Sequence, residues 1–310
     1  MSEREIVCED LNLAIDDLKS QGFRLDVIFP ADEPKAATLS RDGETVRVRV
    51  GDAQPLPDGL PAFEPEFVLT RAGAAPAQGR AGMLYRDLIP GRLGGRYIAS
   101  HITIAEGGPV ADWVHYHHVA LQMIYVRRGW VRVVYEDQGE PFVMNEGDLV
   151  LQPPEIRHQV LESSPGLEVI EIGAPALHET FADHELSLPN GERPGRTLSG
   201  QRFLHHVASE TPWSLFKGAE AQETRMAEAT AGIADVRTIR PGGANGIGFP
   251  PHEGELVFGF AIDGAALLNG RSLGAGDAFA MPPGQSWTLS DMTDDFRLLH
   301  VTTACLDAAA

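Results

Sequence analysis

Two segments of this sequence share one framework of glycines and prolines, and this internal repeat is the strongest constraint on the fold. The segment AEGGPVADWVHYHH aligns with RPGGANGIGFPPHE at an offset of 135 residues, and GDLVLQPPEIRH aligns with GDAFAMPPGQSW at an offset of 129. The offset changes because the loop from Gly129 to Gly147 is six residues longer than the loop from Gly264 to Gly276. The repeat indicates two copies of one unit of about a hundred residues.

Both copies consist of short apolar runs separated by Gly and Pro turns, with almost no helical period. Examples are YIASHITIA, WVRVVYE and LEVIEIG in the first copy and IADVRTIR, LVFGFAI and FRLLHVTT in the second. Many short strands at this spacing are typical of a β-sandwich or barrel. The sequence therefore predicts a mainly β fold with two barrels in tandem.

The first fifty residues follow a different pattern. Residues 6–22, IVCEDLNLAIDDLKSQG, place apolar side chains at helical spacing and end in Gly22, which predicts an amphipathic helix. The runs RLDVIFP, KAATLS and TVRVRV that follow predict strands. We therefore expect a small α+β unit.

Two stretches rich in Pro and Gly lack periodicity and are interpreted as linkers, which divides the chain into domains. The predicted organisation is an α+β module over residues 1–50, a linker over 51–80, a first barrel over 81–185, a linker over 186–201 and a second barrel over 202–310.

Charge and cysteine usage narrow the function. The net charge of −19 opposes nucleic acid and anionic membranes as partners, so we expect a small-molecule substrate. The only cysteines, Cys8 and Cys305, lie at opposite ends, which argues against a disulfide framework or a cysteine metal site. Without a run of about eighteen apolar residues or a basic leader, a soluble cytoplasmic protein is expected.

Three histidines lie within four residues in the stretch HYHHVALQMIYVRRG, which begins at His115. In an extended strand, residues two apart project from the same face, so His115 and His117 should point one way and His118 the other. Two imidazoles on one face are candidate metal ligands.

The first copy resembles the two sequence motifs of the cupin proteins, G(X)5HXH(X)3–4E(X)6G and G(X)5PXG(X)2H(X)3N. The residues that match at the spacings of the family are His115, His117, Gly129, Gly147, Pro153 and His158. Four departures are an extra residue after Gly108, Gln122 in place of the usual Glu, Glu155 in place of a glycine and Glu162 in place of the final Asn. The resemblance covers residues 82–175, and residues 225–304 through the framework alone.

The resemblance implies two cupin barrels, each a double-stranded β-helix or jelly roll, and a metal site formed by His115, His117, Gln122 and His158. Neutral imidazole and amide donors without thiolate suit Fe(II), which we favour, or Mn(II), Ni(II), Cu(II) or Zn(II). These ligands carry no charge, so a bound ion would keep its full 2+ character. We predict no organic cofactor.

The ligand-equivalent positions of the second copy hold Pro250, His252, Val257 and Trp287. One imidazole beside valine and tryptophan cannot hold a divalent ion. The second barrel is therefore predicted to be degenerate and structural.

Other residues are weaker candidates for the pocket of the first barrel. His101 and Thr103 alternate with two isoleucines and would line the pocket if the polar pair faces inward. Ile124 and Val126 share the face of Gln122 and should form an apolar wall. Arg96 could clamp a substrate carboxylate. The sequence identifies no catalytic residue.

The resemblance implies three possible functions. The first is an O2-dependent dioxygenase that cleaves an aromatic ring or a C–C bond, because tandem cupins with one degenerate half are common among such enzymes. The second is a non-redox lyase, isomerase or cyclase, since a three-His, one-Gln set is similar to that of cupin lyases. The third is a non-catalytic binding protein. Residues 1–50 resemble one βαβββ module of the vicinal-oxygen-chelate proteins, and we expect a homodimer to which they could contribute.

Overall fold

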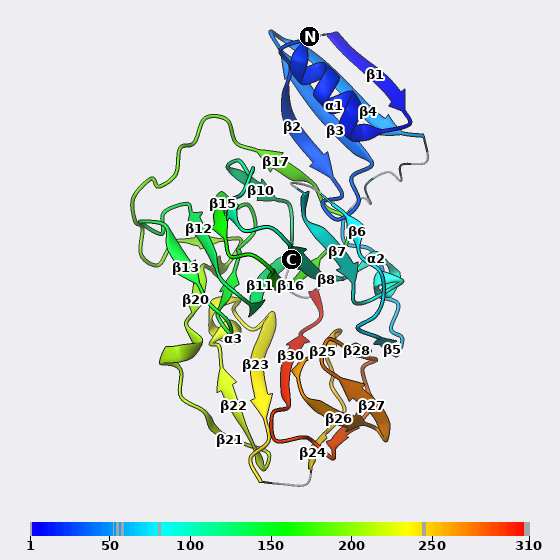
Figure 1. The fold of residues 1–310 in the computed structure, drawn as a ribbon, viewed down its shortest axis with the longest axis vertical. Coiled ribbons are helices and arrows are strands. Elements are labelled where there is room, and N and C mark those ends of the chain that lie inside the picture. Colours follow the sequence, from blue (N-terminus) through cyan, green and yellow to red (C-terminus); the bar gives the residue numbers. More distant parts are fainter. Residues whose placement is uncertain are drawn as a thin grey trace.

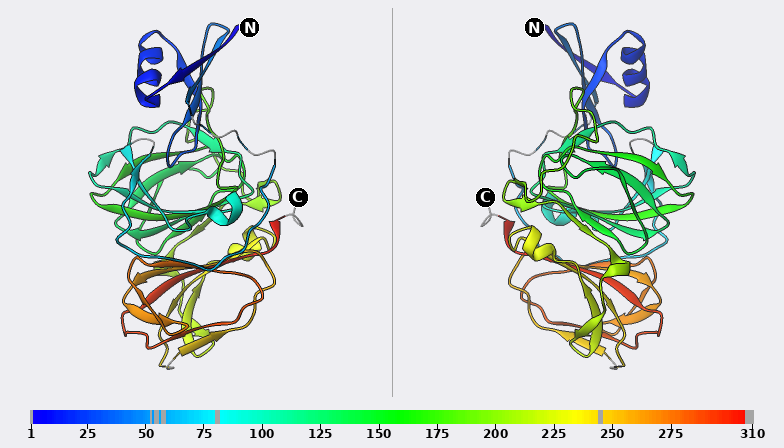
Figure 2. Two further views of the ribbon diagram at one scale, coloured as in Figure 1. Left: turned by 90° about the vertical axis from the view of Figure 1, so that its right-hand side faces the viewer. Right: turned by 90° about the vertical axis from the view of Figure 1, so that its left-hand side faces the viewer.

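The structure is a computed structural model that describes residues 2–51, 53, 56, 59–79, 82–243 and 246–306. It is mainly β, and it contains three parts stacked along the long axis: an N-terminal unit, a first barrel and a second barrel (Figures 1 and 2). The predicted fold class, two jelly-roll barrels in tandem behind a small α+β extension, is confirmed. No helix in the described part of the chain is long and apolar enough to cross a membrane.

The N-terminal unit has one helix on a sheet of order β1-β4-β3-β2. The helix α1 begins at Leu11, where the side chain of Asp10 accepts a hydrogen bond from the backbone N–H of Leu13 and so caps it. The prediction of a helix over residues 6–22 is wrong at its start, because the chain before Asp10 pairs in parallel with β4. The elements are β1 (Ser2–Cys8), α1 (Leu11–Ser20), β2 (Arg24–Phe29), β3 (Ala36–Arg41) and β4 (Glu44–Val50).

The first barrel packs two sheets face to face around an apolar core. One sheet has the order β17-β10-β15-β12-β13, with β9 beside β15, and the other has the order β20-β14-β11-β16-β8-β7-β6. The strands of the first sheet are β9 (Gly108–Pro109), β10 (His115–His117), β12 (Val131–Tyr135), β13 (Phe142–Met144), β15 (His158–Ser163) and β17 (Thr180–Ala182). Those of the second are β6 (Ala77–Gln78), β7 (Leu84–Asp87), β8 (Ile98–Ile104), β11 (Leu121–Arg128), β14 (Leu149–Leu151), β16 (Leu167–Ala174) and β20 (Leu204–His206).

The second barrel repeats this plan with sheets of order β21-β22-β23-β30-β25-β28-β5 and β24-β29-β26-β27. Its strands are β5 (Val68–Thr70), β21 (Ser214–Phe216), β22 (Ala219–Glu223), β23 (Ala234–Arg240), β24 (Gly246–Phe249), β25 (Val257–Asp263), β26 (Ala265–Leu268), β27 (Arg271–Gly274), β28 (Ala278–Met281), β29 (Trp287–Ser290) and β30 (Arg297–Thr303). Short elements elsewhere are α2 (Arg92–Gly95), β18 (Thr197–Leu198), β19 (Gln201–Arg202), a 3-10 turn (Ala208–Glu210) and α3 (Met226–Ala229).

The barrels exchange edge strands, which the predicted boundaries do not include. The strand β5 comes from the predicted linker over residues 51–80 and pairs with β28 of the second barrel. The strand β20 comes from the predicted second barrel and pairs with β14 of the first. Each added strand covers a sheet edge that would otherwise expose unpaired backbone groups.

The repeated glycines occupy equivalent turns in the two barrels. Gly129 and Gly264 follow β11 and β25 with φ of 80° and 66°, and Gly147 and Gly276 precede β14 and β28 with φ of 89° and 84°. Glycine adopts these left-handed conformations without steric cost, which explains why the framework is the same in both copies.

Candidate metal centre

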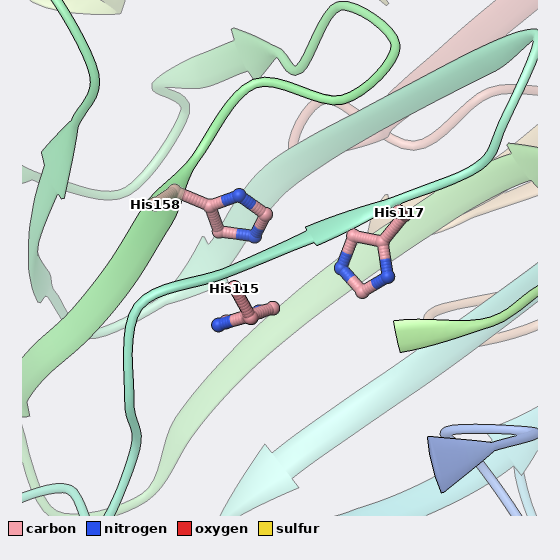
Figure 3. Close-up of side chains that lie close together, drawn as sticks. All are labelled: His115, His117 and His158. Atoms are coloured by element: carbon pink, nitrogen blue, oxygen red, sulfur yellow. The ribbon is translucent and has the colours of Figure 1, made fainter. Parts of the chain in front are cut away.

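Three histidines meet inside the first barrel. His115 and His117 project from β10, and His158 lies opposite His115 in the register of β10 and β15. One ring nitrogen of each lies within 4.8 Å of the others, and the side chains are 1%, 6% and 5% exposed (Figure 3). Among the described residues this is the one cluster of His, Cys, Asp or Glu side chains able to hold a metal ion.

Hydrogen bonds fix the protonation pattern of two of these rings. His115 Nδ1 donates to the backbone oxygen of Trp113 at 2.7 Å, and His158 Nδ1 donates to that of Ile156 at 3.0 Å. Because a carbonyl oxygen only accepts, the proton sits on Nδ1 and the lone pair of the neutral ring is on Nε2. Both rings are therefore prepared for coordination through Nε2, the pattern that outer hydrogen bonds impose on metal-bound histidines.

The third ring is held by a threonine. Thr180 on β17 is fully buried, lies opposite His117 in the register and places its Oγ1 3.1 Å from His117 Nδ1. The hydroxyl contacts Nδ1 of His117, the same ring atom that the backbone carbonyls contact in the other two histidines. All three imidazoles engage Nδ1 outside the cluster, which fits a single ion bound through three Nε2 atoms.

Thr180→Val should weaken binding of a divalent ion by about 10-fold to 100-fold, the usual cost of removing an outer-shell partner. Valine keeps the shape of threonine but cannot hydrogen bond to His117, so the ring loses its fixed orientation. Isothermal titration of the metal-free protein with Mn(II) measures the change. The matched control is Thr230→Val, which removes an equally buried hydroxyl that bonds to Met226 O and should leave the affinity unchanged. Equal affinities for wild type and Thr180→Val would contradict the role of this threonine.

Gln122, the fourth predicted ligand, lies on β11 and lines the same cavity as the histidines. Its side chain is 2% exposed, and Nε2 donates to Glu171 Oε1 at 2.7 Å. Since this contact occupies the amide nitrogen, the carbonyl oxygen is the atom that Gln122 can offer to an ion. The donor set of three imidazoles and one amide oxygen suits a divalent first-row metal.

Glu171 is a cavity residue that the sequence analysis missed. It lies on β16 and shares its face with Leu167 and Val169, which also line the cavity. The segment LEVIEIG has the alternation of a strand but no motif that marks its second glutamate as inward-facing. The only available signal was this period of two, which places Glu171 on the same side as the two apolar residues.

A second carboxylate that was not predicted, that of Asp112, lies next to His115. Asp112 Oδ1 lies 3.5 Å from His115 Nδ1, and Asp112 Oδ2 accepts a hydrogen bond from the backbone N–H of Val160 at 2.9 Å. Its side chain is fully buried. A buried carboxylate next to an imidazole raises the basicity of that ring as a ligand.

The cavity beside the histidines measures about 90 Å³ and is mostly apolar. Tyr135 stacks on His158 with ring centroids 5.5 Å apart, and burial raises the pKa of its phenol, which therefore stays protonated. The remaining wall comes from strands of both sheets and includes Ile102, Ile104, Ile124, Val131, Val133, Met144 and Val160. The site therefore offers a few polar groups within an apolar enclosure, as small-molecule sites do.

Only some of the residues that were predicted to line the pocket do so. Ile124 lines the cavity, whereas Val126 is fully buried in the apolar core around it. The expectation for His101 and Thr103 is wrong, because Ile102 and Ile104 are the pair of β8 that faces the cavity. His101 instead contacts Glu168 at 2.8 Å on the other face of the sheet.

The prediction for Arg96 is also wrong. Its guanidinium is 1% exposed and makes a two-point ion pair with Glu255 of the second barrel. It therefore joins the two barrels and does not reach the cavity. His118, as expected, lies outside the cluster, between Glu155 at 3.6 Å and Glu179 at 3.8 Å.

The interior of the second barrel is filled where the first holds its cluster. Trp287 takes the place of His158 and stacks on Phe249, with ring centroids 3.7 Å apart. His252, the one imidazole at a ligand-equivalent position, donates from Nε2 to the backbone oxygen of Thr303. Val257 is buried and Pro250 is exposed. These four side chains form no group of ligands.

Comparison with known proteins agrees with this geometry. Residues 100–172 match the cupin domain family, a segment that contains His115, His117, Gln122 and His158. No curated protein sequence matches the chain. The sequence match therefore covers only part of the first barrel, and the likeness of fold over most of the chain rests on solved structures.

Three of these structures have the same fold at low identity. Protein Ylba from E. coli has 14% identity and a TM-score of 0.55, and the match covers 81% of this chain and 96% of that one. The putative glyoxylate induced protein from Pseudomonas aeruginosa has 12% identity, a TM-score of 0.56 and coverage of 81% and 94%. A mutant of Bacillus subtilis oxalate decarboxylase has 13% identity, a TM-score of 0.52 and coverage of 83% and 80%. The resemblance of residues 1–50 to a vicinal-oxygen-chelate module stays a prediction.

Proposed function

We propose that the first barrel is the active site of a metal-dependent cupin enzyme that acts on a small oxygenated organic molecule. The observation that supports this proposal is the convergence of three buried imidazoles at the wall of an apolar cavity, with Nδ1 of His115 and of His158 hydrogen bonded to backbone oxygens. His115, His117, His158 and Gln122 would hold one divalent ion. Iron(II) is the favoured ion, with Mn(II), Ni(II), Cu(II) and Zn(II) as alternatives.

When bound, such an ion supplies Lewis acidity and, if it is redox-active, electrons for reaction with O2. The residues of the chain supply the rest. Three imidazoles and one amide add no negative charge, so an anionic substrate oxygen is favoured at the site. The apolar walls formed by Ile102, Ile104 and Ile124 keep bulk water away from the reacting atoms.

The reaction that we favour is O2-dependent cleavage of a C–C bond or an aromatic ring. This choice follows the resemblance to tandem cupins in which one barrel is active and the other is degenerate, and it is an analogy at the level of the fold. One similar structure is an oxalate decarboxylase, whose name describes C–C cleavage of a small dicarboxylate. A cavity of about 90 Å³ suits a substrate of that size better than a large one.

A non-redox lyase, isomerase or cyclase is the second candidate, and Glu171 is the observation that favours it. Gln122 cannot accept a proton, so the four ligands include no general base. The carboxylate of Glu171 lines the same cavity and could receive a proton from a bound substrate. A non-catalytic small-molecule binding protein is the third candidate.

Turnover with and without oxygen separates these candidates. Protein loaded with Fe(II) or Mn(II) would be mixed with small 2-oxo acids, 2-hydroxy acids, β-diketones and catechols, while an electrode records O2 and mass spectrometry records products. We expect O2 uptake that matches product formation, and no turnover by the His158→Ala variant. Equal turnover in anaerobic buffer would contradict the dioxygenase and favour the non-redox enzyme. Tight substrate binding without turnover in either buffer would favour the binding protein.

A further inference from the structure

We propose that the N-terminal unit forms part of the wall of the metal cavity and that Ala31 limits the size of the ligand that can reach the ion. This inference rests on the proposed metal site and assigns a role in ligand selection to residues outside the two barrels. Three observations carry it: a continuous strand ladder, the lining of the cavity and the anchoring of one loop.

The N-terminal sheet continues directly into the metal-binding sheet. The strand β2 pairs with β17, which pairs with β10, and the three strands lie side by side in Figure 1. Along this ladder Ile28 lies opposite Thr180, and Thr180 lies opposite His117. One strand therefore separates the N-terminal unit from a predicted ligand, and the two parts share one ten-stranded sheet.

The chain that leaves β2 reaches the cavity. This strand ends at Phe29, and Ala31 then lines the same cavity as the three histidines. The loop packs closely against Gly79 of the first barrel. A Cβ added to this glycine would lie only 2.8 Å from Ala31 O and 2.4 Å from the ring of Tyr85, so there is no room for a side chain here. Tyr85 also lines the cavity. The loop is thus part of the enclosure.

An ion pair anchors this loop next to Ala31. Asp32 is 8% exposed and hydrogen bonds to Arg92 of α2, whose Nε also lies 3.3 Å from Asp87 of β7. The loop is therefore held on one side by the ladder through β17 and on the other by a partly buried Arg with two carboxylates. A loop held at two points can define the shape of a cavity.

Because the cavity is small, the size of the side chain at position 31 affects which ligands fit. At about 90 Å³ the cavity is well below the roughly 300 Å³ at which pockets for drug-sized ligands begin. A longer side chain at Ala31 would occupy much of this space, and overfilled sites resist adjustment because protein interiors are closely packed. Alanine at this position therefore sets how large a group can bind beside the ion.

Two chelators with the same metal-binding head but different bulk test the inference. Full-length protein loaded with Co(II) would be titrated with acetohydroxamate, benzohydroxamate and azide, and the visible absorption of Co(II) reports binding. We expect Ala31→Phe to weaken acetohydroxamate by about tenfold or more. Ala31→Gly should improve benzohydroxamate relative to acetohydroxamate, and Ala31→Val should lie between wild type and Ala31→Phe. Azide affinity and cobalt content should stay near the wild-type values.

The matched control is Ala74→Phe, the same substitution in an exposed loop. Its affinities for all three probes should equal those of wild type. Equal ratios of the two hydroxamates in Ala31→Gly, wild type and Ala31→Val would overturn the inference while leaving the metal site intact. Wild type that takes up no cobalt would instead overturn the proposed metal site, and the inference with it. If Ala31→Phe does not fold, the glycine and valine variants still decide the result.

Discussion

The His158→Ala variant should purify without bound metal, whereas wild-type protein should carry one ion per chain. The variant removes one of three imidazoles whose ring nitrogens lie within 4.8 Å of one another, and the two that remain on β10 complete only part of the set. Binding to the folded state alone stabilises it by about 3 kcal/mol when the free ion is at a hundredfold excess over Kd. Addition of Mn(II) should therefore raise the Tm of metal-free wild type and leave that of the variant unchanged. Elemental analysis and a thermal melt measure both effects.

His252→Ala is the matched control, because His252 occupies the position in the second barrel that His117 occupies in the first. This variant should keep one ion per chain and the rise in Tm with Mn(II). A His158→Ala protein with a full complement of metal would show that the ion, if any, binds elsewhere. Loss of metal in His252→Ala would contradict the structural role of the second barrel.

Glu255→Ala should lower the free energy of unfolding by about 3–5 kcal/mol, the usual cost of removing one partner of a buried ion pair. Glu255 is 5% exposed, and its two oxygens accept hydrogen bonds from Arg96 Nε at 3.0 Å and Nη2 at 2.7 Å. Tyr97 OH adds a bond at 2.8 Å. Alanine would leave the buried guanidinium without its carboxylate at the junction of the barrels. Urea denaturation followed by tryptophan fluorescence measures the change.

The control for this prediction is Asp263→Ala, which removes a partly exposed ion pair. Asp263 and Arg297 are 38% and 39% exposed, so their pairing should contribute less than about 1 kcal/mol. A similar small loss for Glu255→Ala would contradict a stabilising role for this ion pair at the junction of the barrels. The metal content of both variants should stay at one ion per chain.

The cluster could be predicted from sequence because its ligands belong to short, fixed spacings. Residues two apart on a strand share a face, which places His115 beside His117, and a motif resemblance adds Gln122 and His158. The structure brings the three imidazoles together as expected. Motifs of this kind describe ligands, whereas the neighbours that orient them come from other strands. Thr180 lies 63 residues from His117 and was not predicted.

The contribution of the N-terminal unit could not be predicted for the same reason. The strand β2 meets β17 across about 150 residues of chain, and the pairing depends on which sheet edges remain free after folding. For Arg96 the sequence predicted a role in the pocket that the structure does not support. Its guanidinium suits a substrate carboxylate chemically, but Nε and Nη2 donate to Glu255, 159 residues away, and Nη1 donates to the backbone oxygen of Pro61. Dimer formation and the role of residues 1–50 in it stay predictions.

The central claim is that His115, His117 and His158 bind one divalent ion. Anomalous diffraction from crystals of the Mn(II)-loaded protein, recorded with an x-ray energy at which manganese scatters anomalously, tests it directly. We predict one peak per chain, about 2.0–2.3 Å from the Nε2 atom of each histidine and close to the amide oxygen of Gln122. A peak elsewhere, or no peak in crystals of protein loaded with manganese by several routes, would contradict the claim.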